Sequence, residues 1–467
     1  MLEQIFLHQK QFSLKLREEP LKIRLEYLSD LEKMVMDHTE DIVQALRLDF
    51  AKPEAEALLT EIYPVLHEIR YVKKNLKKWI KPQRVSAPLG LMGTKNYILP
   101  VPRGVCLIIG PWNYPFQLMI APLIAALAAG NCAFLKPSEF TPHTSALLKV
   151  LIKKTFSEDH VTLIEGGVEI TQSLLELPFD HIFFTGSTQV GKIVMAAASK
   201  HLSSVTLELG GKSPTVIDST ADLEQAAEKI TWAKFVNAGQ TCVAPDYLLI
   251  HRDIFSEFRS HLIKKIETYY GKSDHQKKNS PDLARIISVK HTERLAQLLK
   301  DAVKQNAEIT YGGDIDIPHR YIAPTLIEKV DMHSALMKEE IFGPLLPMIP
   351  FHEISEVLHF INDRPKPLAL YIYSHSEMNI EALTKGTSSG GVCINDSVIH
   401  VGNVHLPFGG IGESGLGNYH GYFGFRAFSH EKSVLRQYWL GRLLRVIYPP
   451  YTAFKINLIK KLIRWRL

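Results

Sequence analysis

Short apolar runs that alternate with longer helical stretches constrain the fold of this chain more than any other feature. Such runs stand at residues 105–109, 132–135, 161–164 and 181–184. Strands that are buried on both faces read as continuous apolar runs, and helices between them make parallel connections. The pattern therefore predicts an α/β fold with a doubly wound parallel sheet, which binds ligands beyond the carboxyl ends of its strands.

The chain is long enough to hold a second domain of the same class. Its 467 residues exceed what one hydrophobic core usually supports. Apolar runs recur at 215–217, 247–250 and 370–373, so a second parallel-sheet domain is expected after the first. Nearer the N-terminus, apolar residues at helical spacing predict amphipathic helices around residues 21–28 and 62–76.

The composition is that of an ordinary globular protein in a reducing compartment. Hydrophobic residues make up 46% of the chain and charged residues 22%, and no basic segment followed by an apolar run opens it. The cysteines, Cys106, Cys132, Cys242 and Cys393, have neither metal-binding spacing nor the density of a disulfide framework. We therefore expect a cytoplasmic protein with free thiols and no metal site.

Positive charge is concentrated at the C-terminus. The net charge is +5, yet residues 432–467 carry nine Lys or Arg and no Asp or Glu, so the rest of the chain carries −4. A single basic segment argues against a general nucleic-acid surface and for a localised anionic partner.

Cys242 is the candidate nucleophile. It follows the turn-forming residues 239–241 and precedes Pro245, where a helix does not readily continue, so its sulfur can face a cleft. A free cysteine is more often an inert core residue. Here the chain also offers a carboxylate at Glu208 and an amide at Asn113, and acyl chemistry at a thiol needs a nucleophile, a base and a hydrogen-bond donor.

Two strand ends carry candidate cofactor contacts. Residues 184–191 read as a strand, a glycine turn and a helix start, with Ser187 or Thr188 as the N-cap. A helix N-terminus can face a pyrophosphate. The glycine spacing here is not the Gly-x-Gly-x-x-Gly fingerprint of dinucleotide-binding proteins, and an ordinary capped turn between a strand and a helix has the same sequence pattern. At the other strand end Lys136 and Glu139 stand three residues apart, where they can hold a ribose or form a surface ion pair.

Seven motifs stand in the order of one known family. They are Pro-Trp-Asn-Tyr-Pro at 111–115, Leu-Lys-Pro-Ser-Glu at 135–139, Phe-Thr-Gly-Ser at 184–187, Leu-Glu-Leu-Gly-Gly-Lys at 207–212, the cysteine segment at 235–245, Glu-Glu-Ile-Phe-Gly-Pro at 339–344 and Leu-Pro-Phe-Gly-Gly at 406–410. With these motifs the chain resembles the aldehyde dehydrogenase superfamily from about residue 21 to 451. Residues 419–421, 428–430 and 448–451 resemble its class 3 branch, which acts on fatty and aromatic aldehydes.

The resemblance implies a mechanism and a cofactor. Cys242 would attack the aldehyde carbon, Asn113 would stabilise the oxyanion of the thiohemiacetal, and Glu208 would activate the water that hydrolyses the thioester. The hydride acceptor is expected to be NAD, because Glu139 would repel the 2′-phosphate of NADP. Class 3 relatives often accept both cofactors, so the resemblance implies that NADP is also accepted. The residues implied in cofactor binding are Trp112, Lys136, Glu139, Gly186, Ser187, Val190, Gly191, Glu340 and Phe342.

The resemblance also implies an aldehyde dehydrogenase-like fold, with two doubly wound parallel-sheet domains and a small bridging sheet that joins a homodimer. The expected segments are a dinucleotide-binding domain at 1–80 and 101–209, a catalytic domain at 210–394, bridging and oligomerisation segments at 81–100 and 395–431, and a basic tail at 432–467.

Two other functions stay open. A CoA-acylating semialdehyde dehydrogenase would use CoA in place of water, but Glu208 is present to activate water. A non-catalytic binding or structural protein that retains the fold would be favoured by loss of Cys242, Glu208 or Asn113, and all three are present. The role of His420 is also open, and a packed core residue is the commoner use of a histidine among aromatic neighbours.

From residue 452 the tail predicts a basic amphipathic helix. Phe454, Leu458, Leu462 and Trp465 recur on one side, and basic residues gather on the other. Interspersed Lys and Arg exclude a spanning helix, which needs about 20 mostly apolar residues. Such a helix suits an anionic membrane interface and would make the protein peripheral on the cytoplasmic face of a membrane. The alternative is that it packs on a partner subunit or over the substrate entrance.

Overall fold

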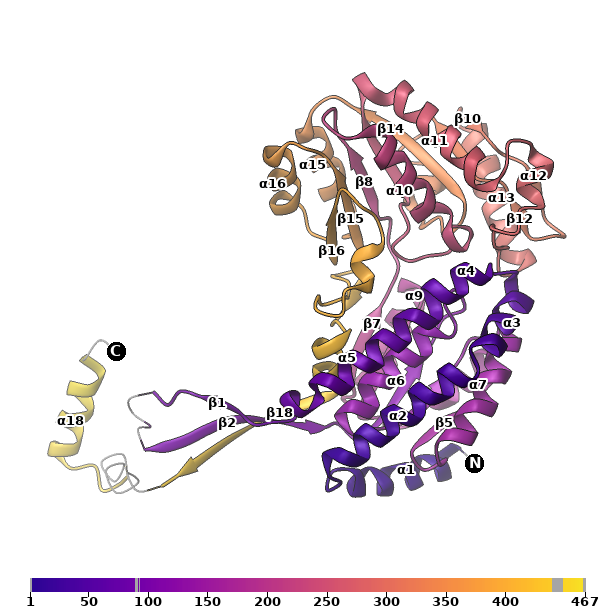
Figure 1. Cartoon of the computed structure of the whole chain (residues 1–467). Coiled ribbons are helices and arrows are strands. Elements are labelled where there is room, and N and C mark those ends of the chain that lie inside the picture. The colour runs from indigo at the N-terminus through magenta and orange to yellow at the C-terminus, as the bar shows by residue number, and fades with distance from the viewer. Residues whose placement is uncertain (1, 89–90, 92, 439–447, 465–467) are drawn as a thin grey trace.

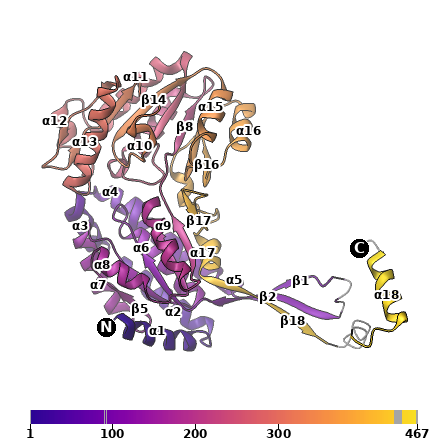
Figure 2. The same cartoon turned by 180° about the vertical axis from the view of Figure 1, so that it is seen from behind.

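The computed structural model describes residues 2–88, 91, 93–438 and 448–464 of the chain. In this part of the chain two large sheets, each flanked by helices, form the body, and a thin sheet extends from it as an arm (Figure 1). The first helix lies against the body and the last one lies beyond the arm, as the view from behind also shows (Figure 2).

The predicted parallel sheet is present, with the strand order β17-β7-β6-β3-β4-β5. Its strands are β3 Val105–Ile109, β4 Cys132–Lys136, β5 Val161–Leu163, β6 His181–Thr185, β7 Ser204–Glu208 and β17 Gly415–Leu416. All neighbours are parallel except β17, which runs antiparallel to β7. Every residue of β3 to β6 is buried, which explains why most residues of these strands are apolar.

Helices cover this sheet on both faces (Figures 1 and 2). They are α1 Leu2–Leu16, α2 Leu21–Asp37, α3 Thr39–Phe50, α4 Glu54–Ala57, the π-helix η1 Leu58–Ile62, α5 Tyr63–Trp79, α6 Gln117–Ala129, α7 Pro142–Thr155, α8 Val168–Leu175 and α9 Thr188–Ser199. Every residue of α6 is buried, because α2, α5 and the later helix α17 (Gly421–Ala427) pack around it. The helices predicted around residues 21–28 and 62–76 correspond to α2 and to η1 with α5.

The second large sheet has the order β10-β13-β14-β9-β8-β15-β16, and only β10 is antiparallel to its neighbour. Its strands are β8 Pro214–Ile217, β9 Tyr247–His251, β10 Glu308–Tyr311, β13 Thr325–Glu328, β14 Leu345–Phe351, β15 Ala369–Tyr373 and β16 Gly391–Ile394, and a separate pair is β11 Ile315–Asp316 with β12 Tyr321–Ile322. The helical elements are α10 Leu223–Phe235, η3 Val236–Gly239, η4 Arg252–Ile254, α11 Phe255–Tyr270, α12 Asp274–Lys278, α13 Val289–Lys304, α14 Ala335–Lys338, α15 Ile354–Asn362, α16 Glu377–Gly386 and η5 Ile399–Gly402. The expected fold class is therefore confirmed.

The arm is an antiparallel sheet of β1 Gln83–Val85, β2 Thr94–Pro102 and β18 Ser429–Gln437, with β2 in the middle. The expected boundary between residues 431 and 432 falls inside β18, which pairs with β2 along its whole length. After the arm, α18 spans Ala453–Arg464. Trp465, which the predicted tail helix includes, lies outside the described residues.

Candidate active site

Cys242 follows a strained turn that leaves α10. In η3, Asn237 and Ala238 have φ values of 55° and 53°, and Gly239 has a φ of 75°. L-residues rarely adopt this left-handed region, so the turn persists only because its surroundings impose it. Gly239 is required for a second reason, because a Cβ there would clash with the carbonyl oxygen of Gly343. The turn ends the helix before Cys242, and beyond it the carbonyl oxygen of Gln240 accepts a hydrogen bond from the neighbouring domain.

Hydrogen bonds join Asn113 to the cysteine turn. Its side-chain nitrogen donates to the carbonyl oxygen of Gln240 at 3.0 Å, and the side-chain nitrogen of Asn237 donates to the carbonyl oxygen of Asn113 at 2.9 Å. An amide nitrogen carries two N–H groups, so Asn113 keeps a second donor for an oxyanion. Asn113 is only 3% exposed, and the network therefore fixes its orientation relative to Cys242.

Glu208 is the last residue of β7 and is buried. Neither of its carboxylate oxygens has a hydrogen-bond partner among the described residues. Burial raises the pKa of Glu208 well above its usual value. A carboxyl group in this condition binds protons readily, which is the property a general base requires near neutral pH.

The environment of Cys242 keeps its thiol protonated in this state. Burial, together with the nearby carboxylates of Glu340 and Glu208, which repel a thiolate, raises its pKa to about 12. Since the thiolate is the nucleophile, the proton of Cys242 has to leave as the reaction begins.

Glu340 lines a cleft of about 660 Å³ that borders both domains. Burial raises the pKa of Glu340 to about 8, and its Oε1 has no partner among the described residues. A Cβ on Gly210, which lines the same cleft, would collide with the Glu340 carboxylate. The glycine therefore permits this close approach, and the unpartnered oxygen is free to bind a hydroxyl group.

Other expected cofactor residues lie at the carboxyl ends of the strands of the six-stranded sheet. Ser187 is the N-cap of α9, since its Oγ accepts from the backbone N–H of Val190 at 3.4 Å. A Cβ on Gly186 would collide with the Phe184 ring, and one on Gly191 would collide with the Leu209 side chain. Both glycines are therefore needed for packing, whatever they contact beyond it.

Lys136 and Glu139 are neighbours with different exposure. Lys136 is 2% exposed, and its Nζ donates to the carbonyl oxygen of Pro137 at 2.6 Å. The same Nζ lies 3.8 Å from Oε2 of Glu139, whose side chain is 43% exposed. Nearby, the ring of Trp112 meets that of Phe342 edge to face at 5.2 Å between centroids, which joins the two domains beside the cleft.

Several functional residues are not predicted by the sequence. Asp246 accepts from Nζ of Lys212 and, through Oδ1, from the backbone N–H of Ile341 at 3.0 Å, and so ties the segment that carries Glu340 to the 210–212 loop. Asn237, described above, orients Asn113. Asp246 reaches Ile341 across 95 residues of the chain and Asn237 reaches Asn113 across 124, relations that no local spacing signals.

His420 packs in the core. It is 6% exposed, and its ring stacks on Phe408 with centroids 5.2 Å apart. Burial lowers its pKa to about 4, so it is neutral at physiological pH. Among the described residues no group of three or more His, Cys, Asp or Glu is arranged to hold a metal ion.

Comparisons with known proteins agree with this geometry. The chain matches the aldehyde dehydrogenase family over residues 8–434. It is 46% identical to the 4,4'-diaponeurosporen-aldehyde dehydrogenase of Staphylococcus aureus, over 93% of this chain and 94% of that protein. It is 44% identical to aldehyde dehydrogenase family 3 member A2 of Macaca fascicularis (94% and 90% covered) and 43% identical to the dimeric NADP-preferring aldehyde dehydrogenase of Mus musculus (94% and 95% covered).

Solved structures give the same result. The substrate-bound state of Staphylococcus aureus AldH superposes with a TM-score of 0.93 at 44% identity, covering 99% of both chains. The NAD+ complex of an aldehyde dehydrogenase from Bacillus cereus superposes with a TM-score of 0.83 at 29% identity, covering 90% of this chain and 85% of that one. The chain therefore belongs to the aldehyde dehydrogenase family and to its class 3 branch, as its motifs predict.

Proposed function

We propose that this chain oxidises aldehydes to carboxylic acids with NAD(P) as hydride acceptor, through a thioester on Cys242. The observation that carries the proposal is the convergence of Cys242, Asn113 and Glu208 from three elements beside the cleft that Glu340 lines. These residues supply the nucleophile, the oxyanion donor and the base that the reaction needs.

The first step is the addition of the Cys242 sulfur to the aldehyde carbon, during which the S–H bond breaks and its proton passes to water. Negative charge then develops on the aldehyde oxygen, and the second N–H of the Asn113 side chain and the backbone N–H of Cys242 stabilise it. Removing one such donor typically costs about 100- to 1,000-fold in rate. The donors are effective because the hydrogen bonds to Gln240 and Asn237 fix them before the substrate arrives.

Glu208 acts when the thioester is hydrolysed. Its carboxylate takes a proton from water, the resulting hydroxide attacks the acyl carbon, and the bond to sulfur breaks to release the acid. The raised pKa of Glu208 suits this proton transfer. The same residue disfavours a CoA-acylating enzyme, in which water does not attack.

The chain offers a fitting site for a dinucleotide. When bound, NAD(P) supplies the hydride acceptor that converts the thiohemiacetal to the thioester. The unpartnered oxygen of Glu340 fits a ribose hydroxyl in the cleft, the N-terminus of α9 at Ser187 fits a pyrophosphate, and Lys136 with Glu139 fits the second ribose. The relatives include an NADP-preferring enzyme and an NAD+ complex, which supports use of both forms.

The proposed substrates are medium- or long-chain fatty aldehydes, or aromatic ones. The similarity to family 3 enzymes and to an enzyme named for 4,4'-diaponeurosporen-aldehyde supports this class. The test is the formation of reduced cofactor and of the acid when purified protein meets hexadecanal or benzaldehyde. Cys242→Ala should abolish it and Cys393→Ala, at another free thiol, should not. Equal rates in Cys242→Ala and the native protein would contradict the proposal.

The arm supports a homodimer. β18 is an edge strand whose outer side faces no described strand, and such an edge readily pairs with another chain. One relative is named as dimeric. We expect two copies to associate through this edge.

The tail supports a peripheral contact with an anionic membrane. Phe454 is 75% exposed and Ile463 is 78% exposed on α18, beside the exposed Lys460 and Lys461. No described helix has both the length and the apolar character needed to cross a bilayer. The proposal predicts that the native chain sediments with phosphatidylserine vesicles at low salt and that deletion of 452–467 releases it, without loss of activity on short aldehydes. Native protein that stays in solution would instead assign α18 to packing on a partner.

A further inference from the structure

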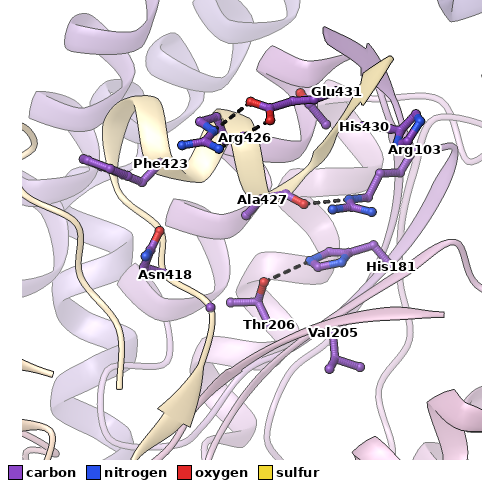
Figure 3. A pocket seen from close by; sticks show the side chains of 12 residues that line it. Arg103, His181, Val205, Thr206, Asn418, Phe423, Arg426, Ala427, His430 and Glu431 are labelled. Atoms are coloured by element: carbon purple, nitrogen blue, oxygen red, sulfur yellow. Dashed lines mark hydrogen bonds and ion pairs between the residues drawn. The ribbon is translucent and has the colours of Figure 1, made fainter. Parts of the chain in front are cut away.

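A second pocket lies at the base of the arm, away from the candidate active site. Its volume is about 460 Å³, and it lies where β7, α17 and the start of β18 meet (Figure 3). Arg103, Asn418 and Phe423 form parts of its wall. None of the residues that line it belongs to the candidate catalytic or cofactor-binding sets.

Arg103 brings to this pocket a positive charge that no ion pair with a described residue neutralises, although the Asp180 carboxylate acts on it from further away. It lies between β2 and β3, and its Nε donates to the carbonyl oxygen of Ala427 at 2.7 Å. Among the described residues no carboxylate forms an ion pair with it, whereas the neighbouring Arg426 is paired with Glu431 at 2.9 Å. Burial lowers the pKa of Arg103, which shows that its charge is partly removed from water. A partly buried guanidinium without a counter-ion favours an anion from solution.

The histidine in the wall adds no charge. The Nδ1 of His181 pairs with the Ser204 hydroxyl at 2.8 Å, and its Nε2 pairs with the Thr206 hydroxyl at 3.3 Å. Burial lowers the pKa of His181 to about 3, so the ring is neutral. The net positive charge at this wall therefore comes from Arg103.

The free edge of β7 adds a backbone donor. The N–H groups of a strand alternate between its two sides, and the N–H of Leu209 faces the β17 side, where it donates to Ser414 at 3.1 Å. By the same alternation the N–H of Val205 faces that side too. β17 pairs only with Leu207 and Glu208, so it ends before Val205. The backbone N–H of Val205, which lines the pocket, is therefore available to a ligand.

Asn418 and Phe423 complete the chemical character of the pocket. Asn418 is exposed, lies across the pocket from Arg103 and carries two further N–H donors (Figure 3). Phe423 adds an apolar surface. Thus the guanidinium of Arg103, the backbone amide of Val205 and the side-chain amide of Asn418 border the pocket, whose volume falls in the range of small-molecule sites.

We propose that this pocket binds a phosphate-type oxyanion, either free or as the phosphate group of a small metabolite, through Arg103, the Val205 amide and Asn418. Phosphate offers oxygens in the geometry that a guanidinium fork and neighbouring amides match. The pocket touches α17 and the first residues of β18, so a bound anion would connect the body of the molecule to the base of the arm.

Calorimetric titration of inorganic phosphate into the full chain tests the proposal, with NAD present at saturation so that the cofactor cleft is filled. Saturable binding is expected, and chloride at equal ionic strength should not replace it. Arg103→Gln and Asn418→Asp should each weaken binding at least tenfold, since one removes the fork and the other opposes the anion with a carboxylate. Arg252→Gln, at an exposed arginine far along the chain, should leave binding unchanged.

Asn418→Asp guards against a variant that fails to fold, because Asn418 is exposed and makes no side-chain hydrogen bond with a described residue. Absence of saturable phosphate binding to the native chain, or an affinity of both variants equal to that of the native chain, would overturn the proposal. Glycerol 3-phosphate in solution and phosphatidic acid in vesicles then distinguish a soluble ligand from a lipid headgroup. If Asn418→Asp weakens the binding of one of these two ligands, the oxyanion site is supported, and that ligand shows whether the phosphate comes from a soluble metabolite or from a lipid.

Discussion

Buried groups whose ionised forms are disfavoured give the candidate site its chemistry. Cys242, Glu208 and Glu340 all have raised pKa values, and burial is the largest cause at each. Each charge also opposes the next, so only a partial set can be ionised at neutral pH.

The motif residues could be predicted from sequence because their chemistry is local to a strand end or a turn. The roles of Cys242, Glu208 and Asn113 stay predictions, and their motifs are what single them out. Asn237, which orients Asn113 from 124 residues away, could not be predicted, because only the folded chain brings the two together. Raised pKa values escape sequence analysis for the same reason, since burial is a property of the packed core.

Glu139 gives a prediction about cofactor choice. Its side chain is 43% exposed beside Lys136, where a 2′-phosphate of NADP would meet its charge. Glu139→Ser should raise the ratio of kcat/KM for NADP to that for NAD by about tenfold, which corresponds to the loss of roughly 1.4 kcal/mol of repulsion. Steady-state kinetics with both cofactors measure the ratio, and Glu165→Ser, at another partly exposed glutamate, should leave it unchanged. An unaltered ratio in Glu139→Ser would mean that this carboxylate does not face the ribose.

Among the elements, strands were easier to predict than the first helix. The strands β3 to β6 are buried on both faces, and most of their residues are apolar. α1 is not predicted by an apolar pattern, since its buried face includes the polar Gln9 and Ser13, which interrupt the apolar stripe. Gln9 is buried because its side-chain nitrogen donates to the carbonyl oxygen of Glu158 at 3.0 Å, a contact that local spacing does not signal.

The turn η3 gives a matched pair of glycine predictions. Gly239→Ala adds a Cβ that collides with the carbonyl of Gly343, so it should lower stability by about 1–3 kcal/mol and abolish most activity by displacing Cys242. Ala238→Gly should change stability by less than about 1 kcal/mol, because relief of left-handed strain offsets the added freedom of the unfolded chain. Urea unfolding and turnover measure both. Equal tolerance of the two substitutions would show that the turn does not position the thiol.

A buried carboxyl between α5 and α17 gives a pH prediction. Burial raises the pKa of Glu68 from 4.5 to about 7, and its Oε1 accepts from the backbone N–H of Gly421 at 2.6 Å. Because the folded-state value is the higher one, the stability that Glu68 contributes is fully present below about pH 4.5 and is lost as pH rises through 7. The full shift corresponds to about 3 kcal/mol.

Glu68→Gln should therefore flatten the fall in unfolding free energy between pH 4.5 and about 7, since the amide keeps the acceptor and cannot ionise. Urea denaturation at several pH values measures the slope. Glu40→Gln, at an exposed position on α3, should retain the native slope. A Glu68→Gln slope equal to that of the native protein would place the titration elsewhere.

At the scale of the whole molecule, the arm separates a self-contained body from the C-terminal helix (Figure 1). The resemblance implies a bridging segment at residues 81–100, but the sequence does not predict the length of β18, because Ser429–Gln437 is mostly polar and exposed and lacks the apolar alternation of a packed strand. Its register with β2 arises only when two segments more than 300 residues apart meet.

The outer edge of β18 gives a prediction about assembly. Ser429 and Glu431 lie opposite Pro102 and Pro100 of β2. Proline has no N–H, so these are the pairs of the antiparallel ladder that exchange no hydrogen bonds, and the N–H groups of the odd-numbered β18 residues point away from β2. Ser433→Pro should remove one outward donor and weaken dimerisation at least tenfold, whereas Ser433→Ala should not. Sedimentation velocity across a concentration series measures this. A dimer of unchanged affinity in Ser433→Pro would place the interface elsewhere.

The most direct test of the proposed chemistry is mass spectrometry of the acyl intermediate. Glu208→Gln should still form the thioester but hydrolyse it slowly, so mixing this variant with NAD and hexanal should yield a burst of NADH and a hexanoyl adduct. After proteolysis the adduct should lie on the peptide that contains Cys242, require NAD, and be absent from a Cys242→Ala, Glu208→Gln double variant. An adduct on Cys393, or none at Cys242 while NADH still forms, would contradict thioester catalysis at this cysteine.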